Sequence, residues 1–318
     1  MKPNTGTQGN AARVIASYGR HYLIETDEGH RRMAHPRGKK MVAVVGDRVQ
    51  WSASGDAAVI ESVLPRRNCL LRRDAVRTKV FAANIDQILL LVAAEPDFSE
   101  EQLARVLIAA EAEQIPAVIA VNKRDLGPAH AKAMARLAPY PQMGYTLLGF
   151  SLQAREAGEL DSIRSLLTGK ATLVLGPSGA GKSSLINRLV PHAQAETQEI
   201  SQALNSGKHT TTRTTWYWLD RTRNSAVIDS PGFQEFGLQH IEALALASLM
   251  PDLRRHIGHC RFHNCTHLHE PDCAVIAAVG APGPEGIAPQ RYRICQTLFA
   301  ECSKAREYAR GGRPADWQ

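Results

Sequence analysis

The sequence predicts a multidomain α/β protein with a β-barrel at the N-terminus, a central parallel-sheet domain and a helical, metal-binding domain at the C-terminus. Three observations lead to this fold class. Short β-rich runs fill the N-terminal part, strands and helices alternate from about residue 85, and cysteines cluster with histidines near the C-terminus. A chain of 318 residues is also too long for one core of ~100–200 residues. We expect domain boundaries at 1–80, 81–240 and 241–318.

The N-terminal domain is expected to be a small β-barrel. Its runs of β-branched and aromatic residues show no helical periodicity, and glycine-bearing turns separate them. The runs that we expect to form strands are 13–17, 21–26, 48–52 and 57–63. Five or so short strands suit a small closed barrel, for which the OB-fold is the leading candidate.

Basic residues are concentrated in this same domain. Residues 1–80 hold 15 Lys and Arg against seven Asp and Glu, whereas the rest of the chain is nearly balanced and the whole chain carries +7. This excess predicts a surface for a polyanion such as RNA, and the alternative is a solvated basic face without a partner. The candidate contacts are Arg37, Lys39, Lys40 and the basic run 66–79, which we expect to be an irregular linker. Because the aromatic residues are few (Tyr18, Tyr22 and Trp51), we expect recognition of RNA shape and backbone.

The central domain alternates strands and helices. The predicted strands are 88–94, 116–121, 146–150, 171–175, 216–219 and 226–228, and the predicted helices are 99–113, 129–137, 161–167 and 181–189. This alternation predicts a mostly parallel sheet with helices on both faces. Ligands of such sheets bind at the carboxyl ends of the strands, where the motifs described next are found.

A phosphate loop follows the predicted strand 171–175. The string Gly176-Pro177-Ser178-Gly179-Ala180-Gly181-Lys182-Ser183 fits the pattern G-x-x-x-x-G-K-[ST], and Ser184 continues it into a helix. Its glycines let backbone N–H groups surround phosphate oxygens, while Lys182 reaches the β- and γ-phosphates and Ser183 holds Mg²⁺. The pattern by itself does not separate ATP from GTP.

A guanine-reading motif precedes the phosphate loop. Asn122-Lys123-Arg124-Asp125 fits NKxD at the end of a predicted strand, where Asp125 would accept hydrogen bonds from guanine. Ser151, after the third predicted strand, is a candidate for contact with the guanine O6 atom. Ordinary GTPases carry NKxD after the phosphate loop, so the reversed order indicates a circularly permuted GTPase. The alternative is a phosphate-loop ATPase or kinase in which NKxD occurs by chance.

Two further segments lie where a GTPase needs them. Asp229-Ser230-Pro231-Gly232 fits D-x-x-G, with Asp229 holding Mg²⁺ through water and the Gly232 N–H meeting the γ-phosphate. The polar segment 207–212 includes Thr211, whose hydroxyl is a candidate to complete the Mg²⁺ shell in a switch region. After D-x-x-G the chain has Phe233, where Ras-like enzymes place a glutamine that orients water.

The C-terminal cysteines predict a metal site. Cys260, Cys265 and Cys273 lie among several histidines, and in a reduced chain such a cluster favours zinc over disulfides. Three thiolates and one imidazole would close a tetrahedral site, so we expect one structural zinc ion per chain. Spacing alone leaves the imidazole open among His256, His259, His263, His267 and His269. We also expect helices at 241–249 and 290–309.

These motifs, in this permuted order, resemble the RsgA (YjeQ/YloQ) family of circularly permuted GTPases. The strings 45–49, 82–87, 207–212 and 229–238 and the cysteine cluster are similar to that family's sequence, so the resemblance covers about residues 10–300. It implies an N-terminal OB-fold, a C-terminal zinc domain and GTP hydrolysis stimulated by the small (30S) ribosomal subunit during its late maturation, with 16S rRNA as a partner. It also implies that His209 acts on the attacking water and that His267 is the imidazole zinc ligand.

A non-enzymatic RNA-binding protein with a decayed nucleotide site is the remaining alternative. Intact Lys182, Ser183 and Asp229 argue against decay. The longest apolar run has only the length of a buried strand, and the N-terminus lacks the apolar core of a signal peptide. We therefore expect a cytoplasmic monomer without a membrane partner.

Overall fold

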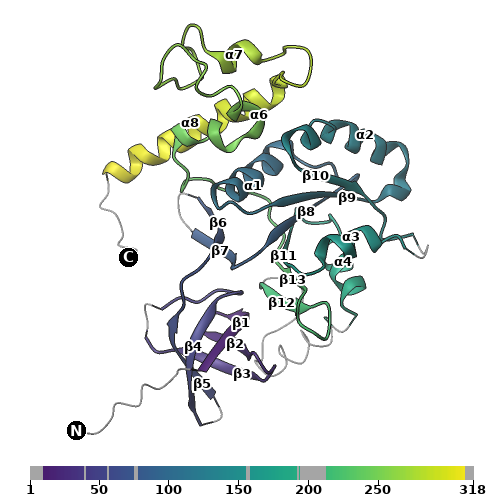
Figure 1. The fold of residues 1–318 in the computed structure, drawn as a ribbon, viewed down its shortest axis with the longest axis vertical. Helices are drawn as coiled ribbons and strands as arrows, with labels where there is room; N and C mark the ends of the chain where they lie inside the picture. The colour runs from purple at the N-terminus through teal and green to yellow at the C-terminus, as the bar shows by residue number, and fades with distance from the viewer. Residues whose placement is uncertain are drawn as a thin grey trace. The chain divides into compact units, whose positions relative to one another are not determined.

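The computed structural model describes residues 10–38, 41–55, 57–74, 78–154, 158–191, 193 and 213–311 (Figure 1). The chain forms two compact units, which are described separately. The first comprises residues 1–70, 80–89 and 154–232, and the second comprises residues 71–79, 90–153 and 233–318. Each unit therefore draws on several parts of the sequence, and the expected domain boundaries at residues 80 and 240 stay a prediction.

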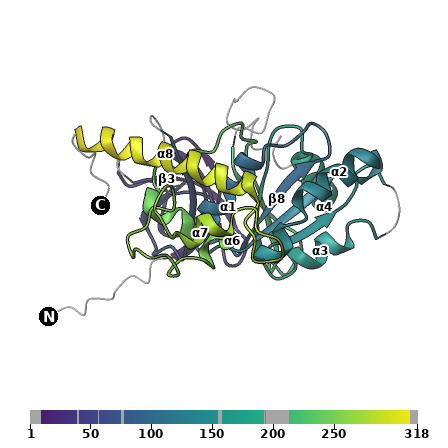
Figure 2. The same ribbon diagram turned by 90° about the horizontal axis from the view of Figure 1, so that it is seen from above.

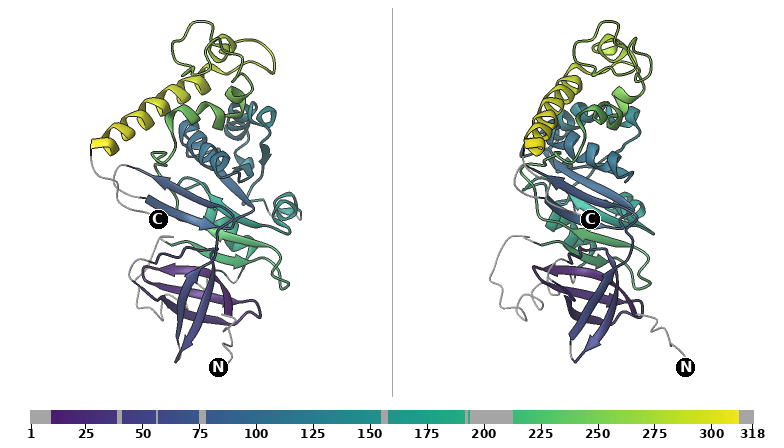
Figure 3. Two further views of the ribbon diagram at one scale, coloured as in Figure 1. Left: turned by 60° about the vertical axis from the view of Figure 1, so that its left-hand side comes forward. Right: turned by 90° about the vertical axis from the view of Figure 1, so that its left-hand side faces the viewer.

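The first unit contains the predicted five-stranded barrel. Its strands are β1 (Asn10–Tyr18), β2 (His21–Thr26), β3 (Arg31–Pro36), β4 (Arg48–Ser54) and β5 (Ala57–Val63). They follow the order β1-β2-β3-β5-β4, and pairing of β1 with β4 closes the barrel (Figure 3). Its buried interior includes Val14, Ile24, Trp51 and Ile60. The sequence did not indicate β3, because Arg31 and Arg32 hide its short apolar alternation.

Strands from the central part of the sequence complete the first unit. β11 (Ala171–Leu175) pairs in parallel with β13 (Ala226–Asp229), and β12 (Thr215–Trp218) pairs antiparallel with β13. β12 also meets β1 of the barrel at one antiparallel position. The helices of this region are α3 (Asp161–Leu167) and α4 (Lys182–Leu189). All five residues of β11 are buried, as expected for a central strand.

The second unit contains the other parallel strands. β9 (Ala117–Asn122) pairs in parallel with β10 (Thr146–Gly149) and lies next to β8 (Gln87–Ala93), whose last four residues belong to this unit. Helices α1 (Glu100–Ala112) and α2 (Pro128–Leu137) accompany them. The Ser99 hydroxyl caps α1 by accepting from the Gln102 N–H at 3.3 Å. The short turns η1 (Arg124–Leu126) and η2 (Tyr140–Met143) flank α2.

The basic run 66–79 is not an irregular linker throughout, so that expectation was wrong. β6 (Cys69–Arg73) and β7 (Thr78–Ala83) form a two-stranded sheet. Leu70 and Phe81 are buried in it. The flanking arginines concealed this apolar content in the sequence, since a charged run resembles a solvated linker.

The C-terminal part of the second unit is helical and irregular. It contains the turns η3 (Ala243–Ala245) and η4 (Ala247–Leu249), and the helices α6 (Pro251–Arg254), α7 (Ala274–Ala278) and α8 (Pro289–Gly311). Two 3₁₀ turns occupy the segment 241–249 where a helix is expected, and the extended Met250 before Pro251 separates them from α6. Arg291 of α8 makes a two-point ion pair with Asp252 of α6, at 2.8 and 2.9 Å. The ribbons of α6 and α8 are labelled in Figure 2.

None of the helices in the described ranges is both long enough and apolar enough to cross a bilayer.

Candidate nucleotide-binding and metal sites

The phosphate loop lies in the first unit, between β11 and α4. Gly179 and Gly181 have φ values of +81° and +99°, which are left-handed conformations that favour glycine. The side chain of Lys182 is buried, whereas Ser183 and Ser184 are exposed at the start of α4. The predicted residues Gly176, Pro177, Ser178, Gly179, Ala180, Gly181, Lys182, Ser183 and Ser184 therefore form one turn from strand into helix. Backbone N–H groups at such a helix N-terminus attract phosphate.

Lys182 and Asp229 carry the charge of this phosphate half. The Lys182 ammonium donates to the carbonyl oxygens of Gly176 and Pro177, at 2.8 and 2.7 Å. Burial lowers the pKa of Lys182, although the nearby Asp229 charge opposes that shift. Burial raises the pKa of Asp229 to about 6, against the attraction of Lys182. Within the described chain, the buried Asp229 Oδ1 atom has no hydrogen-bond partner.

The D-x-x-G segment approaches the phosphate loop closely. The Ser230 hydroxyl donates to the Val174 carbonyl oxygen at 2.7 Å, which fixes the segment against β11. A Cβ atom added to Gly232 would lie 3.1 Å from the Lys182 ammonium and 3.4 Å from the Ser178 backbone nitrogen. A larger residue at position 232 would therefore crowd the Lys182 ammonium. The unpartnered Asp229 oxygen and the hydroxyl of Ser183 are hard oxygen donors of the kind that Mg²⁺ prefers, so these residues fit a magnesium ion.

The guanine-motif half lies in the second unit, after β9 and β10. Asn122 is buried, and its Oδ1 atom accepts from the N–H groups of Lys123 and Leu152, at 2.7 and 3.3 Å. Arg124 donates its backbone N–H to the Phe150 carbonyl oxygen at 3.0 Å, which ties the motif to the end of β10. The Ser151 hydroxyl donates to the Asp125 carboxylate.

This arrangement gives Ser151 a contact that the sequence did not indicate. Ser151 is buried and holds the carboxylate of Asp125, which is itself exposed. Its proposed contact with guanine stays a prediction. An exposed carboxylate fixed by one hydroxyl still has acceptor sites for the two donors of a guanine edge.

His209 and Thr211 lie outside the described residues, and their roles stay predictions. Phe233 is buried and packs edge-on against Phe236, with ring centroids 5.6 Å apart. An apolar side chain packed in this way does not orient water.

The predicted metal ligands converge in the second unit. One donor atom from each of Cys260, Cys265, His267 and Cys273 lies within 4.8 Å of the others. The Cys260 and Cys273 sulfurs are 3.8 Å apart, and each is 3.5 Å from the His267 Nδ1 atom. A tetrahedral zinc ion with bonds of about 2.3 Å to sulfur and 2.0–2.1 Å to nitrogen separates its ligands by about 3.8 and 3.5 Å. These residues therefore fit zinc.

Glu270, which the sequence did not single out, organises the loop that carries two of these ligands. Its carboxylate accepts from the backbone N–H groups of Thr266, Leu268 and His269, at 2.9, 3.2 and 3.3 Å, and from the Thr266 hydroxyl. Burial raises its pKa, but these hydrogen bonds prevail and the net pKa is strongly lowered. Only the geometry reveals this role, because a lone glutamate between histidines has no sequence signature.

Several of the candidate RNA contacts already have partners in the protein. Arg66 makes a two-point ion pair with buried Asp47, at 2.7 and 2.8 Å, and Arg37 pairs with Glu61. Tyr22 and Trp51 are buried in the barrel and are not available to stack on bases. Tyr18 is half-buried with the Arg213 guanidinium 4.8 Å from its ring. Lys39 and Lys40 lie outside the described residues.

The chain is similar to curated proteins over most of its length. Residues 63–239 match the family model described as RsgA GTPase. A small ribosomal subunit biogenesis GTPase RsgA from Variovorax paradoxus is 61% identical over 294 residues, which cover 92% of both chains. The protein of that name from Bordetella pertussis is 46% identical over 296 residues, which cover 93% of this chain and 97% of the relative.

Two solved structures share the fold. YloQ, titled a circularly permuted GTPase, aligns with a TM-score of 0.67 and 24% identity over 96% of this chain and 98% of its own. YjeQ from Thermotoga maritima aligns with a TM-score of 0.70 and 27% identity over 92% of this chain and 98% of its own. These matches, with the permuted order of the motifs, show that the chain belongs to the RsgA GTPase family and is a GTP hydrolase.

Proposed function

We propose that this chain hydrolyses GTP to GDP and phosphate on the small (30S) ribosomal subunit, which stimulates the reaction and whose late maturation the protein assists. The main support for the chemistry is the buried Asp229 carboxylate beside Lys182 at the phosphate loop, whose Oδ1 atom has no hydrogen-bond partner among the described residues. The printed names of the relatives, small ribosomal subunit biogenesis GTPases, support the choice of partner.

In this proposal the phosphates bind the loop 176–183 and the Gly232 N–H, and Asp125 accepts from the guanine edge. Lys182 exchanges its loop carbonyl partners for β- and γ-phosphate oxygens as the nucleotide enters. Ser183, Thr211 and Asp229 hold Mg²⁺, which neutralises charge that develops on the phosphates. A carbonyl is a weaker partner for an ammonium than a phosphate, so this exchange favours binding.

His209 aligns the attacking water in this proposal. A neutral imidazole, with an unperturbed pKa of about 6.5, can accept a hydrogen bond from water at neutral pH. Phe233 leaves the Ras-like position without a polar group, which supports a role for another residue. His209→Ala should therefore reduce turnover far more than the affinity for a non-hydrolysable GTP analogue. Equal loss of both would assign His209 a structural role.

The barrel and the zinc-binding module are proposed to contact the 30S subunit, with 16S rRNA as the polyanion. The charge excess of residues 1–80 and the Cys₃His cluster support these assignments. One structural zinc ion per chain would keep the module folded. The protein is proposed to act in the cytoplasm as a monomer.

The decisive experiment measures release of phosphate from GTP with and without purified 30S subunits, and with 50S subunits as the matched control. We expect stimulation of about tenfold or more by 30S subunits alone, which corresponds to about 1.4 kcal/mol of barrier. Equal rates under all conditions would overturn the assignment of the partner. Hydrolysis of ATP as fast as GTP would favour the ATPase alternative instead.

A further inference from the structure

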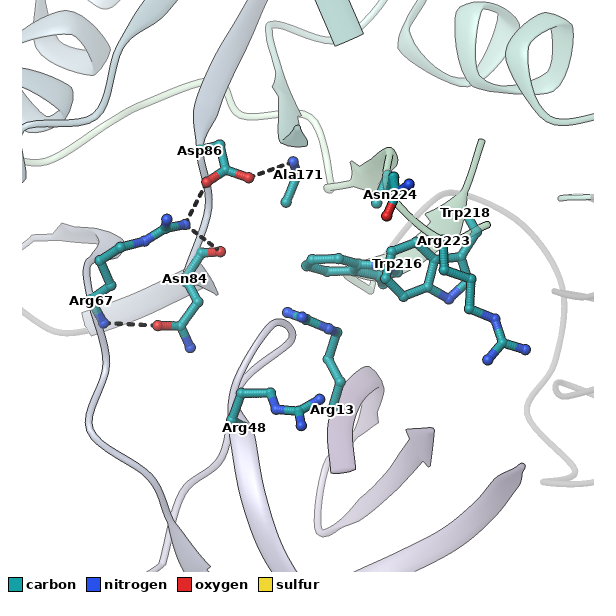
Figure 4. Close-up of a pocket in the computed structure, with 11 residues that line it drawn as sticks. Arg13, Arg48, Arg67, Asn84, Asp86, Ala171, Trp216, Trp218, Arg223 and Asn224 are labelled. Atoms are coloured by element: carbon teal, nitrogen blue, oxygen red, sulfur yellow. Dashed lines mark hydrogen bonds and ion pairs between the residues drawn. The ribbon is translucent and has the colours of Figure 1, made fainter. Parts of the chain in front are cut away.

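A second pocket lies in the first unit, apart from the phosphate loop. Its volume is about 410 Å³, within the range of about 300–1,000 Å³ that is typical of small-ligand sites. Its walls come from the barrel, from the segment before β8, and from β11 to β13 (Figure 4). The lining residues that carry charge, aromatic rings or amides are Arg13, Arg48, Arg67, Arg223, Asp86, Asn84, Asn224, Trp216 and Trp218. None of them belongs to the phosphate loop, NKxD, D-x-x-G or the cysteine cluster, although Arg48, Asn84 and Asp86 lie in the strings 45–49 and 82–87 and Arg67 lies in the basic run 66–79.

Positive charge exceeds negative charge in this pocket. The lining holds four arginines and one carboxylate. Arg67 donates to Asp86 at 2.6 Å, and Asp86 also accepts from the Ala171 N–H at 2.8 Å. Arg48 makes a two-point pair with Asp27, at 2.7 and 2.9 Å, and that aspartate is largely exposed.

Among the four arginines of the pocket, Arg13 has no hydrogen-bond acceptor within the described chain. No hydrogen bond or close ion pair joins its guanidinium to another residue of the described chain. Instead it lies 4.4 Å from the ring centre of Trp216 and 5.9 Å from that of Trp218. Burial, and then the charge of Arg48, lower the pKa of Arg13. Five N–H donors thus face a pocket that supplies few acceptors.

The tryptophans add another unpaired donor and an aromatic wall. The Nε1 atom of Trp216 is buried without a partner among the described residues, whereas the Trp218 Nε1 atom donates to Glu25 at 2.6 Å. The two rings meet edge to face, with centroids 5.3 Å apart. Figure 4 shows the Trp216 ring and Arg13 pointing into the same space.

We propose that this pocket binds a phosphate group carried by a nucleotide, either free or as part of an RNA strand, through Arg13 and Arg48. Planar guanidinium groups match phosphate oxygens in a two-point geometry, and an unpaired donor gains most from a charged acceptor. The aromatic wall and Asn224 then flank the nucleoside. A mononucleotide fits the volume of the pocket, and the barrel is of a type that binds nucleic acid elsewhere. The inference does not rest on the proposed ribosomal function.

The test follows tryptophan fluorescence of the protein loaded with one equivalent of GDP and Mg²⁺, so that the phosphate loop is occupied. The probes are inorganic phosphate, adenosine monophosphate and a uridine RNA hexamer. We expect a saturable change with at least one nucleotide-bearing probe. Saturation by adenosine monophosphate identifies a free nucleotide as sufficient, and saturation by the hexamer alone identifies a strand. A saturable response to inorganic phosphate alone would overturn the nucleotide assignment.

Arg13→Gln should weaken binding of the effective probe by about tenfold, since a charged hydrogen-bond donor is lost. Arg32→Gln is the matched control, because Arg32 also lies over a barrel tryptophan, 5.6 Å from the Trp51 ring centre, but outside the pocket. It should change the dissociation constant by less than about twofold. If Arg13→Gln fails to fold, Asn224→Asp places a repelling charge at an exposed residue of the pocket and should weaken binding similarly. Equal weakening by the pocket and control variants, or no saturable response to any probe, would overturn the proposal.

Discussion

The charged groups of the phosphate loop and of the Cys₃His module differ in how completely other groups of the protein hydrogen-bond to them. Among the described residues beside the loop, Asp229 keeps an oxygen without a donor, and Lys182 donates to the loop carbonyls of Gly176 and Pro177. In the module, Glu270 accepts hydrogen bonds from three backbone N–H groups, the Thr266 hydroxyl and the Cys265 thiol. The first arrangement suits the exchanging nucleotide of the proposed function, whereas the second suits the proposed structural ion.

The difference has an energetic consequence. A buried polar group without a partner destabilises the protein by about 1–3 kcal/mol, and a charged group by more. In a region that exchanges ligands, the bound ligand supplies the missing hydrogen-bond or charge partner, so the destabilisation is present only while the site is empty. A structural metal site instead gains most when its ligands are fixed before the ion binds.

The largest effect is expected from Lys182→Ala. It removes the ammonium proposed to stabilise charge on the transferred phosphate, so GTP hydrolysis should fall by at least about a hundredfold. Lys132→Ala, at an exposed position on α2, is the matched control and should hydrolyse GTP at the wild-type rate. Single-turnover phosphate release measures both variants. Activity of Lys182→Ala within tenfold of wild type would remove the phosphate loop from the chemistry.

Cys265→Ser should abolish stable metal binding in the module. An alcohol oxygen is a poor zinc ligand at neutral pH, and the binding free energy of such sites is largely folding free energy. We expect zinc content, measured by elemental analysis, to fall from about one per chain to a small fraction. Cys295→Ser is the control, because Cys295 is buried in α8 outside the cluster. Wild-type protein that folds with well under one zinc per chain would contradict the assignment.

The sequence predicted the parts of the two sites that obey fixed spacing rules. The phosphate loop, NKxD and D-x-x-G each follow a strand, and the cysteine spacing predicted a cluster that the structure brings together. These motifs are local, so their chemistry is visible without the fold.

The rest depends on partners that are distant in sequence. Arg13 and Trp216 are separated by some two hundred residues, and no pattern links them before β1 and β12 meet. The contact of Ser151 with Asp125 arises because β10 ends beside β9. Likewise, the sequence did not show that Tyr22 and Trp51 lie in the barrel core, which depends on strand register.

The NKxD motif is a third region with a charged group, but its Asp125 side chain is exposed, unlike that of Asp229. Asp125→Asn exchanges a carboxylate oxygen for an amide donor, so GTP affinity should fall by about 10–100-fold and preference should move to xanthine nucleotides. Competition binding of GDP and xanthosine diphosphate measures this change. Asp161→Asn, at the start of α3, is the control. A variant with full affinity for GDP would show that NKxD does not read the base.

A smaller effect is expected from Glu270→Gln. The amide retains one acceptor oxygen but loses the charge that the backbone N–H groups surround, so zinc affinity should fall by about tenfold. Because the folded pKa of Glu270 is lowered, its stabilising contribution is present above the unfolded value of about 4.3 and is lost as the pH falls. Chelator competition at pH 7 measures the loss. If the zinc affinity is unchanged, Glu270 stabilises only the local turn and does not contribute to metal binding.

The smallest effect tests whether the buried, ionised carboxylate of Asp229 lowers the free energy of unfolding. The pKa of Asp229 is raised to about 6 in the folded protein, above an unfolded value of about 3.9. Between these values the folded state binds a proton that the unfolded state has released, so stability decreases as the pH rises through this window. In the absence of nucleotide and Mg²⁺, Asp229→Asn should therefore be more stable than wild type at pH 7, with the difference in stability nearly vanishing near pH 4.

Urea unfolding at pH 4.5 and 7.5 measures this difference. Asp220→Asn is the control of opposite sign, because hydrogen bonds led by that from Thr222 lower the pKa of Asp220 to about 2. That carboxylate stabilises the protein above the unfolded pKa, so its replacement should destabilise the chain at pH 7.5. If Asp229→Asn gives the same change in stability at both pH values, the ionised carboxylate is not the source. Buried charge at Asp229 would then not explain the difference between the phosphate loop and the Cys₃His module.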